Sequence, residues 1–485
     1  MLGRHLLGYL PVQAAQALVG FGGVAILTRL MPTDMYGRYA LAITVMHLGG
    51  MALFSWLDAA VARFHARSDR RNGLAAHLRT AYLVYAGLAV FVLAAGALAL
   101  YLLPFSAELK TALGFALAAL TLKSALHIGQ ETRRAAGQVA AYSGLETLNL
   151  LLGFAVGIGL LLATPLGAAG PLAGMAIGAI VALVFDLPGQ FARMRNGRAR
   201  ARRAAVYLAY GLPVSISLVF EHLLSAGDRF LIAGMLGESA VGIYAAGYGL
   251  ADRTLDIIFI WLGAAAAPLT IAALEHRGMD AARELAGRTA RIMGLIAFPA
   301  AAGLALVAAP LAAVMVGEEF RAGAITILPW IALAGLMNGM MTYYFHEAFT
   351  LKRRTRSMAT IMAVAAVLNI ALNLVFLPLF GIAGAAAATV IAYGFGLVAC
   401  AILGRRIFAL PLPWRDWGKA ALATGAMAAA VLAIPVPDTA MLALIIKAVT
   451  GALVYGAAAL ALDAAGCRSW IGDARALLKP AEASS

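Results

Sequence analysis

Long apolar runs separated by short charged breaks cover most of the chain. An α-helix needs about twenty apolar residues to cross the hydrocarbon core of a bilayer, and each run is close to that length. The runs predict fourteen membrane-spanning helices, at residues 8–28, 39–60, 80–103, 111–130, 139–163, 170–187, 206–236, 240–268, 292–316, 324–348, 357–378, 382–404, 418–434 and 439–463. The sequence therefore predicts an all-α polytopic membrane protein.

Composition agrees with this pattern. The chain is 63% apolar and 12% charged, whereas soluble domains carry about 45–50% apolar and about 25% charged residues. A soluble enzyme, a disordered chain and a disulfide scaffold are excluded. The two cysteines, Cys400 and Cys467, and the eight histidines have no metal-ligand spacing, so we expect no metal and no cofactor.

The distribution of Lys and Arg predicts the orientation of the helices. The net charge of +14 would suggest nucleic acid in a soluble protein, but here 29 of the 37 Lys and Arg fall in alternate loops and the termini. Only four fall in the opposite loops, and cytoplasmic loops of membrane proteins carry the excess of Lys and Arg. We therefore predict that both termini are cytoplasmic.

Two short sequence echoes indicate an internal repeat. Gly37, Tyr39 and Ala40 recur as Gly242, Tyr244 and Ala245, at a constant offset of 205 residues. A second echo, in the same order, pairs Leu148-Asn149 and Pro165–Gly170 with Leu368-Asn369 and Pro378–Gly384. The copies are six spans apart, so they have the same orientation, as in transporters built from parallel repeats.

The repeat predicts the division of the chain. Residues 1–192 would form an N-terminal six-helix lobe and residues 206–406 a C-terminal six-helix lobe. Residues 193–205 carry six arginines and would be a basic cytoplasmic linker. Residues 407–485 would add helices 13 and 14 and a cytoplasmic tail.

Polar side chains inside the spans recur every three or four residues, which puts each set on one helix face. The sets lie in span 4 (Lys123, His127, Gln130, Arg134), span 5 (Ser143, Glu146, Asn149), span 7 (Ser217, Glu221, Ser225, Asp228), span 8 (Tyr244, Tyr248, Asp252, Asp256) and span 10 (Asn338, Thr342, His346). A charge at the centre of a spanning helix costs about 2.5–3.5 kcal/mol, so these groups predict a hydrated cavity or buried ion pairs.

Depth along the helices singles out three groups near the bilayer midplane. At 1.5 Å per residue, Lys123, Glu221 and Arg253 should lie there. A cation in each half is what a permeating anion would need. The carboxylates Glu221, Asp252 and Asp256 are candidates for holding a coupling proton or cation, and the sequence does not choose among them.

Three stretches resemble the bacterial polysaccharide-biosynthesis flippases of the multidrug/oligosaccharidyl-lipid/polysaccharide exporter superfamily, in the O-antigen-flippase-like branch. They are Leu27–Tyr39, Gly227–Tyr248 and Asn369–Ala385. The run Ala251-Asp252-Arg253 with Asp256 is also similar to span 8 of the related lipid II flippases, where the Asp-Arg pair lines the central cavity. The arginines of their spans 1 and 2 are not matched here, which argues against lipid II itself as the substrate.

The resemblance implies two six-helix lobes and alternating access. It implies a substrate of undecaprenyl-pyrophosphate-linked oligosaccharide, moved to the outer leaflet of the inner membrane for O-antigen, exopolysaccharide or capsule. Arg253 and Lys123 would attract the pyrophosphate, with Asp252 and Glu221 beside them, and Tyr244, Tyr248 and Asn338 would face the sugars. The expected partners are this lipid-linked sugar, membrane lipids, and a polysaccharide polymerase with export machinery, without nucleic acid.

Two other functions remain as alternatives. A cation-coupled multidrug exporter of the same superfamily would want an acidic, aromatic cavity, whereas the first span has no acid and basic residues reach the midplane. A membrane enzyme such as a glycan polymerase or ligase would need catalytic groups in a sizeable outside loop. No outside loop exceeds about a dozen residues, so we predict a transporter and not an enzyme.

Overall fold

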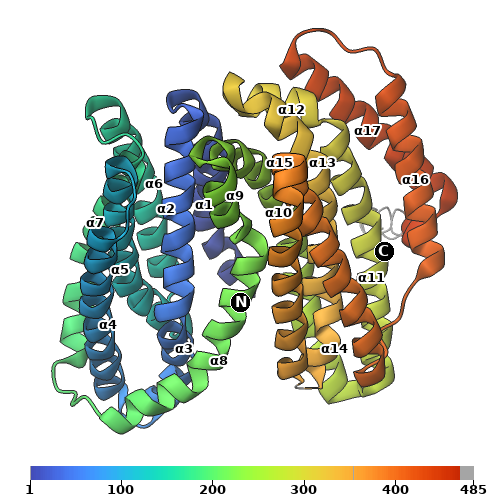
Figure 1. Cartoon of the computed structure of the whole chain (residues 1–485). Helices are drawn as coiled ribbons and strands as arrows, with labels where there is room; N and C mark the ends of the chain where they lie inside the picture. The colour runs from blue at the N-terminus through green and yellow to red at the C-terminus, as the bar shows by residue number, and fades with distance from the viewer. Residues whose placement is uncertain (1, 353, 470–485) are drawn as a thin grey trace, which may run out of the picture. The chain divides into compact units, whose positions relative to one another are not determined.

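The computed structural model describes the backbone of residues 2–352 and 354–469, and the side chains of these residues apart from 2–7, 264–268 and 355. All regular structure in these ranges is helical (Figure 1). This confirms the predicted all-α fold. The helices form two compact units, Met1–Ala245 (unit 1) and Ala246–Ser485 (unit 2).

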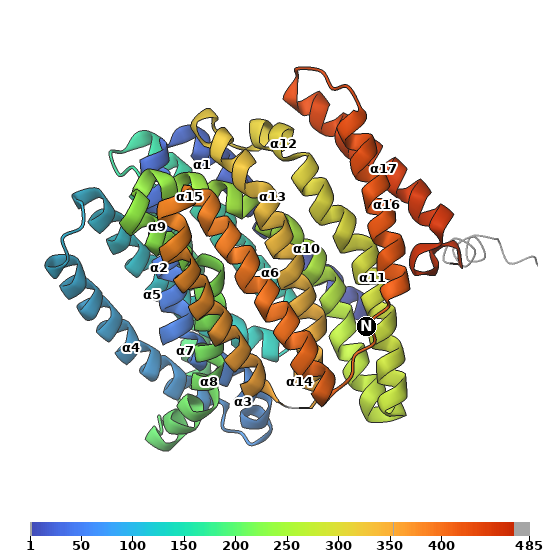
Figure 2. The ribbon, with the colours of Figure 1, turned by 45° about the vertical axis from the view of Figure 1, so that its right-hand side comes forward.

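Unit 1 contains nine helices and the first residues of a tenth. They are α1 (Leu2–Leu30), α2 (Thr33–Leu53), α3 (Ser55–Arg70), α4 (Leu74–Leu102), α5 (Ala107–Ala135), α6 (Val139–Ala163), α7 (Ala169–Met194), α8 (Ala201–Ala226), α9 (Asp228–Leu236) and α10 (Glu238–Arg277). Helices α2 and α3 are bent by 48° and together make one broken span. Helix α4 lies at the edge of unit 1 (Figure 2).

Helices α6 and α7 pack closely on each other through glycines. A Cβ atom added to Gly174 would lie 2.3 Å from the Gly157 Cα atom, and one added to Gly178 would lie 2.9 Å from the Gly153 Cα atom. Both helices carry glycines four residues apart, and small residues at this spacing let the backbones of membrane helices touch. These glycines fix the position of α6, whose polar side chains face the interior of unit 1.

Unit 2 contains the remainder of α10 and the C-terminal helices. They are α11 (Met279–Leu306), α12 (Ala308–Met315), α13 (Glu318–Met340), the π-helical turn η1 (Met341–Phe345), α14 (His346–Leu351), α15 (Thr355–Ile407), α16 (Trp414–Ala433), α17 (Ala440–Leu462) and the short 3-10 turn η2 (Ala464–Gly466). Helix α13 packs on α10, where Gly339 lies against the Phe259 ring.

Helix α15 is two spans joined at a kink. Gly381 has a φ of 59° and a ψ of −142°, which a residue with a side chain rarely adopts. The two arms are tied by Asn369 Nδ2, which donates to Thr389 Oγ1 at 3.3 Å, and Asn373 Nδ2 donates to Asn369 Oδ1 at 3.2 Å. Asn369 therefore bonds from one arm to the other, whereas Asn373 bonds within its own arm.

The number of spans can be compared with the fourteen predicted. Among the described residues, ten helices are long and apolar enough to cross a membrane, and eleven if α2 and α3 count as one broken span. Helix α15 counts once in that total although it covers the two predicted spans 357–378 and 382–404. The other two predicted spans, 240–268 and 418–434, lie in α10 and α16. Both are helical, but neither is among the helices counted as long and apolar enough to cross a membrane.

The compact units do not follow the predicted lobes. Unit 1 ends at Ala245 and includes α8, which packs on α2, α3 and α4. The prediction assigned α8 to the second lobe because it divided the chain according to the internal sequence repeat. The compact units instead reflect which helices contact one another. The division into lobes at residues 193–205 stays a prediction.

Candidate functional site

Lys123 lies on α5 and lines a cavity of about 230 Å³ inside unit 1. His47 from α2, Asp58 from α3 and His127 from α5 line the same cavity. Lys123 and His127 are four residues apart, so they share a helix face. His127 Nδ1 lies 3.9 Å from Asp58 Oδ2, the distance of a loose ion pair when the imidazole is protonated. The cavity therefore holds one ammonium group and one acid–imidazole pair.

The same lysine also borders a second, smaller space. Lys123 lines it with Tyr39 from α2 and Asn149 from α6. One turn before Asn149, the Glu146 Oε2 atom is buried, and within the described part of the chain it has no hydrogen-bond partner. The charge of Glu146 acts on Lys123. The polar stripe predicted for residues 139–163 thus faces into unit 1, with Lys123 as its cationic counterpart.

Helix α2 also meets the α8–α9 segment through polar side chains. Arg229 Nη1 donates to Thr44 Oγ1 at 3.3 Å. One turn further along α2, the His47 ring meets the His222 ring edge-on, with centroids 6.0 Å apart. These contacts extend the polar lining from the Lys123 cavity along α2.

The predicted residues Glu221, Tyr244 and Tyr248 have different environments. Glu221 is exposed on α8. Tyr244 is fully buried and its hydroxyl donates to Asp228, and Tyr248 is only 3% exposed. Contact between these tyrosine rings and a sugar would require a change that exposes them.

The repeated glycines of the sequence meet each other in the structure. A Cβ atom added to Gly37 would lie 1.8 Å from the Glu238 carbonyl oxygen, and one added to Gly242 would lie 2.0 Å from the Thr33 carbonyl oxygen. Glu238 follows Thr33 by the same 205 residues that separate the glycines. The contact therefore has local two-fold symmetry between the start of α2 and the start of α10. Arg38 Nε donates to Glu238 Oε2 at 2.6 Å, which adds a hydrogen bond between the two helix starts.

The unit 2 residues predicted for substrate and ion binding lie on α10 and α13. Arg253 is exposed, and Asp252 and Asp256 are half-buried on α10. Asn338 is half-buried on α13, where Thr342 Oγ1 donates to its side-chain oxygen at 3.3 Å. On α10 the exposed Arg253 therefore has one carboxylate before it in the sequence, Asp252, and one after it, Asp256.

A π-helical turn interrupts the helix that follows Asn338. Residues 341–345 adopt it, and such turns in α-helices are frequent at functional sites. Directly after it, the His346 Nε2 atom and both carboxylate oxygens of Glu347 are buried, and in the described ranges they have no hydrogen-bond partner. An uncompensated buried carboxylate is costly, so Glu347 is a further candidate for holding a proton or cation.

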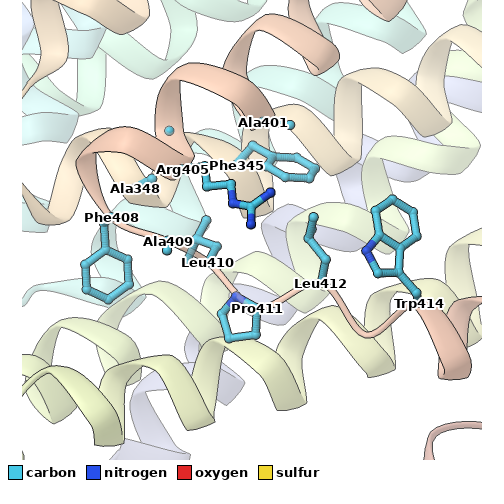
Figure 3. Close-up of a pocket in the computed structure, with 11 residues that line it drawn as sticks. Phe345, Ala348, Ala401, Arg405, Phe408, Ala409, Leu410, Pro411, Leu412 and Trp414 are labelled. Atoms are coloured by element: carbon cyan, nitrogen blue, oxygen red, sulfur yellow. The ribbon is translucent and has the colours of Figure 1, made fainter.

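A pocket of about 310 Å³ lies at the end of α15 in unit 2. Figure 3 shows Arg405 there among apolar side chains, with Phe408 and Trp414 at its margins. Arg283 and Lys352 lie 5.5 and 5.9 Å from the centre of the Phe408 ring. None of the predicted site residues lines this pocket.

Sequence reasoning left out of the site several polar residues that the structure brings to it. Asp58 and His47 line the Lys123 cavity, and the signal in the sequence was two ionisable residues within the predicted span 39–60. Glu347 directly follows His346, the last residue of the polar set predicted in span 10. Within residues 2–352 and 354–469, no group of three or more His, Cys, Asp or Glu could hold a metal ion.

A sequence comparison identifies a related family. Residues 26–324 match a family model described as "Polysaccharide biosynthesis protein". The match covers more than half of the chain, including Lys123 and the α10 residues. A comparison with curated proteins found no significant match.

Solved structures share the fold at low sequence identity. One titled "Lipid II flippase MurJ, inward closed conformation" has a TM-score of 0.76 and 14% identity, covering 96% of this chain and 100% of that one. A multidrug resistance MATE family transporter of the MOP superfamily has a TM-score of 0.67 and 15% identity, covering 81% and 94%. A MOP superfamily transporter from Pyrococcus furiosus, whose title notes a "reverse polarity of binding pocket", has a TM-score of 0.60 and 14% identity, covering 82% of this chain and 93% of that one.

Proposed function

The chain belongs to the polysaccharide biosynthesis protein family and has the fold of MOP superfamily transporters, and on that premise we propose that it is a lipid-linked oligosaccharide flippase. It would move undecaprenyl-pyrophosphate-linked oligosaccharide from the cytoplasmic to the outer leaflet of the bacterial inner membrane by alternating access. The product would serve O-antigen, exopolysaccharide or capsule synthesis.

The observation that carries this proposal is the cation at the Lys123 cavity. An ammonium group inside a spanning helix is costly, and such residues mark substrate or ion pathways. Lys123 borders open space on two sides, with His47 and His127 near it. A pyrophosphate group would supply the negative charge that this lining favours.

Arg253 would provide the second anion contact, from α10. Its side chain is exposed, and a guanidinium can bind two phosphate oxygens at once. Asp252 and Glu221 would orient the cations or bind sugar hydroxyls, and Asn338 offers an amide for the same purpose. Tyr244 and Tyr248 would join only in a state that exposes them.

The driving force would come from a carboxylate that gains and loses a proton or cation during the cycle. Glu221, Asp252 and Asp256 are the candidates from sequence. The buried carboxylates of Glu347 and Glu146 join them, because both have oxygens without a hydrogen-bond partner in the described part of the chain.

The test is a comparison of single variants in a strain whose surface glycan requires this chain. Lys123→Ala and Arg253→Ala should each reduce surface glycan and raise the lipid-linked precursor on the cytoplasmic leaflet. Lys447→Ala is the matched control, because Lys447 lies within the spanning helix α17 and lines none of the described cavities. If both cationic variants export glycan normally at normal protein levels, the proposal is wrong.

The second candidate is a cation-coupled multidrug exporter, which the fold of the MATE family transporter favours. Cationic drugs would be repelled by Lys123 in the unit 1 cavity. Deleting the gene and measuring drug susceptibility separates the two functions. Hypersensitivity to cationic drugs with normal surface glycan would favour the exporter.

A further inference from the structure

A large groove in unit 1 lies apart from the Lys123 cavity. It has a volume of about 870 Å³, within the range of about 300–1,000 Å³ that small-molecule sites occupy. Helices α4, α5 and α7 form it, and its lining is mainly aromatic and aliphatic: Tyr82, Leu83, Tyr85, Leu183, Leu187 and Phe191. We call it the α4/α7 groove. Lys123, Glu146 and Asp58 are not among its lining residues.

The groove opens on the bilayer-facing side of unit 1. Leu83 on α4 is 54% exposed, and Phe191 on α7 is 60% exposed. Helix α4 is an apolar span at the edge of unit 1 with most of its length exposed, so its exposed side chains meet lipid (Figure 2). The occupant of the groove therefore comes from the membrane.

One end of the groove is basic. Arg79 near the start of α4 and Arg195 just after α7 both line it, and Arg195 is exposed. Two hydrogen bonds join the basic linker to α4 at this end of the groove. Arg79 Nη1 donates to the Gly197 carbonyl at 3.2 Å, and the Arg200 backbone amide donates to Thr80 Oγ1 at 3.2 Å. Two guanidinium groups thus lie at the end of an apolar groove.

No lining carboxylate opposes these arginines. The nearby acid on α7, Asp186, is fully buried and paired with Arg133. The Tyr82 hydroxyl, on a residue that lines the groove, is buried, and within the described residues it has no hydrogen-bond partner. A phosphate or ester oxygen entering the groove would satisfy this donor.

We propose that the α4/α7 groove binds one anionic phospholipid from the leaflet on the side of the basic linker. The phosphate lies at Arg79 and Arg195, and an acyl chain packs along Leu83, Leu187 and Phe191. The combination of an apolar body and a cationic end matches an anionic lipid, because each basic residue near a membrane surface favours such a headgroup. This site is separate from the transport site and does not depend on the proposed function.

The test is native mass spectrometry of the full-length protein, delipidated in detergent and titrated with phosphatidylglycerol or phosphatidylcholine. The wild type should bind one phosphatidylglycerol at least about five-fold more tightly than phosphatidylcholine. Arg195→Ala should remove about five-fold of that preference. Arg198→Ala, an exposed arginine of the same linker that does not line the groove, should leave it unchanged.

A second pair of variants tests the apolar part. Leu83→Trp should fill the groove and weaken the first binding of either lipid. Leu98→Trp is the control, because Leu98 is 58% exposed on the same helix and does not line the groove. Thermal melting of each variant confirms that it is folded.

Three results would overturn the proposal. The first is equal wild-type binding of the two lipids, and the second is equal loss in Arg195→Ala and Arg198→Ala. The third is displacement of phosphatidylglycerol by undecaprenyl phosphate at equal concentration, which would assign the groove to a polyprenyl lipid.

Discussion

Replacing Gly37 with alanine should open the contact between α2 and α10. The added Cβ atom would lie 1.8 Å from the Glu238 carbonyl oxygen and 3.1 Å from the Gly242 nitrogen. Both neighbours are backbone atoms, so the two helix starts must separate. The Arg38–Glu238 hydrogen bond of 2.6 Å would lengthen as they do. If transport involves separating these helix starts, the variant shifts the population towards the separated state.

The size of the shift follows from the overlap. A Cβ contact below 3.0 Å is not tolerated, so the backbones must separate by more than 1 Å at this point. Forcing an extra methyl group into well-packed structure costs about 1–3 kcal/mol. A difference of this size between two states changes their ratio by about 5–150-fold.

The assay is the labelling rate of a buried cysteine by a membrane-impermeant maleimide added to intact cells. Ala40→Cys is the reporter, because Ala40 lies one turn beyond Gly37 and is 8% exposed. Cys400 and Cys467 are replaced first. Gly37→Ala should raise the labelling rate by about 5–150-fold.

Gly87→Ala is the matched control. Gly87 lies in α4, and a Cβ atom there would meet no atom within 4 Å. This exchange should leave the labelling rate unchanged. Equal rates in Gly37→Ala and Gly87→Ala, with both proteins folded, would refute the reasoning.

The remaining predictions concern buried polar groups. Asp186→Ala should lower the free energy of unfolding by about 3–5 kcal/mol, because it leaves the mostly buried Arg133 without its partner, and thermal melting in detergent measures this. Asn369→Ala should lower the melting temperature and loosen the α15 kink by removing the bond to Thr389, which hydrogen exchange across α15 detects. Glu347→Gln should reduce glycan export at unchanged protein levels if that carboxylate carries the coupling proton, and normal export would exclude it.

Much of the fold could be predicted because the bilayer requires it. Spanning segments must be long, apolar and internally hydrogen-bonded, so hydropathy locates them. The kink in α15 falls between the predicted spans 357–378 and 382–404, at Gly381. The bond from Asn369 to Thr389 across the kink is of the kind that side-chain amides make between helices in membranes.

The packing faces could not be predicted in the same way. Lipid and neighbouring helices are equally apolar, so an apolar face does not reveal which of them it meets. Tyr244 shows the consequence, because its stripe predicted a cavity and its hydroxyl is instead bonded to the buried Asp228. The α4/α7 groove was missed for the same reason, since Leu83 and Phe191 read as ordinary lipid-facing residues.

The meeting of Gly37 and Gly242 has the geometry of an isologous interface inside a single chain. Gly37 meets the Glu238 carbonyl, and Gly242 meets the Thr33 carbonyl. Thr33 and Glu238 are equivalent positions of the two copies, so the contact is reciprocal, as it is between identical subunits across a dimer axis. A side chain at either glycine would enter the same narrow gap between the two helix starts, so the contact needs glycine at both positions.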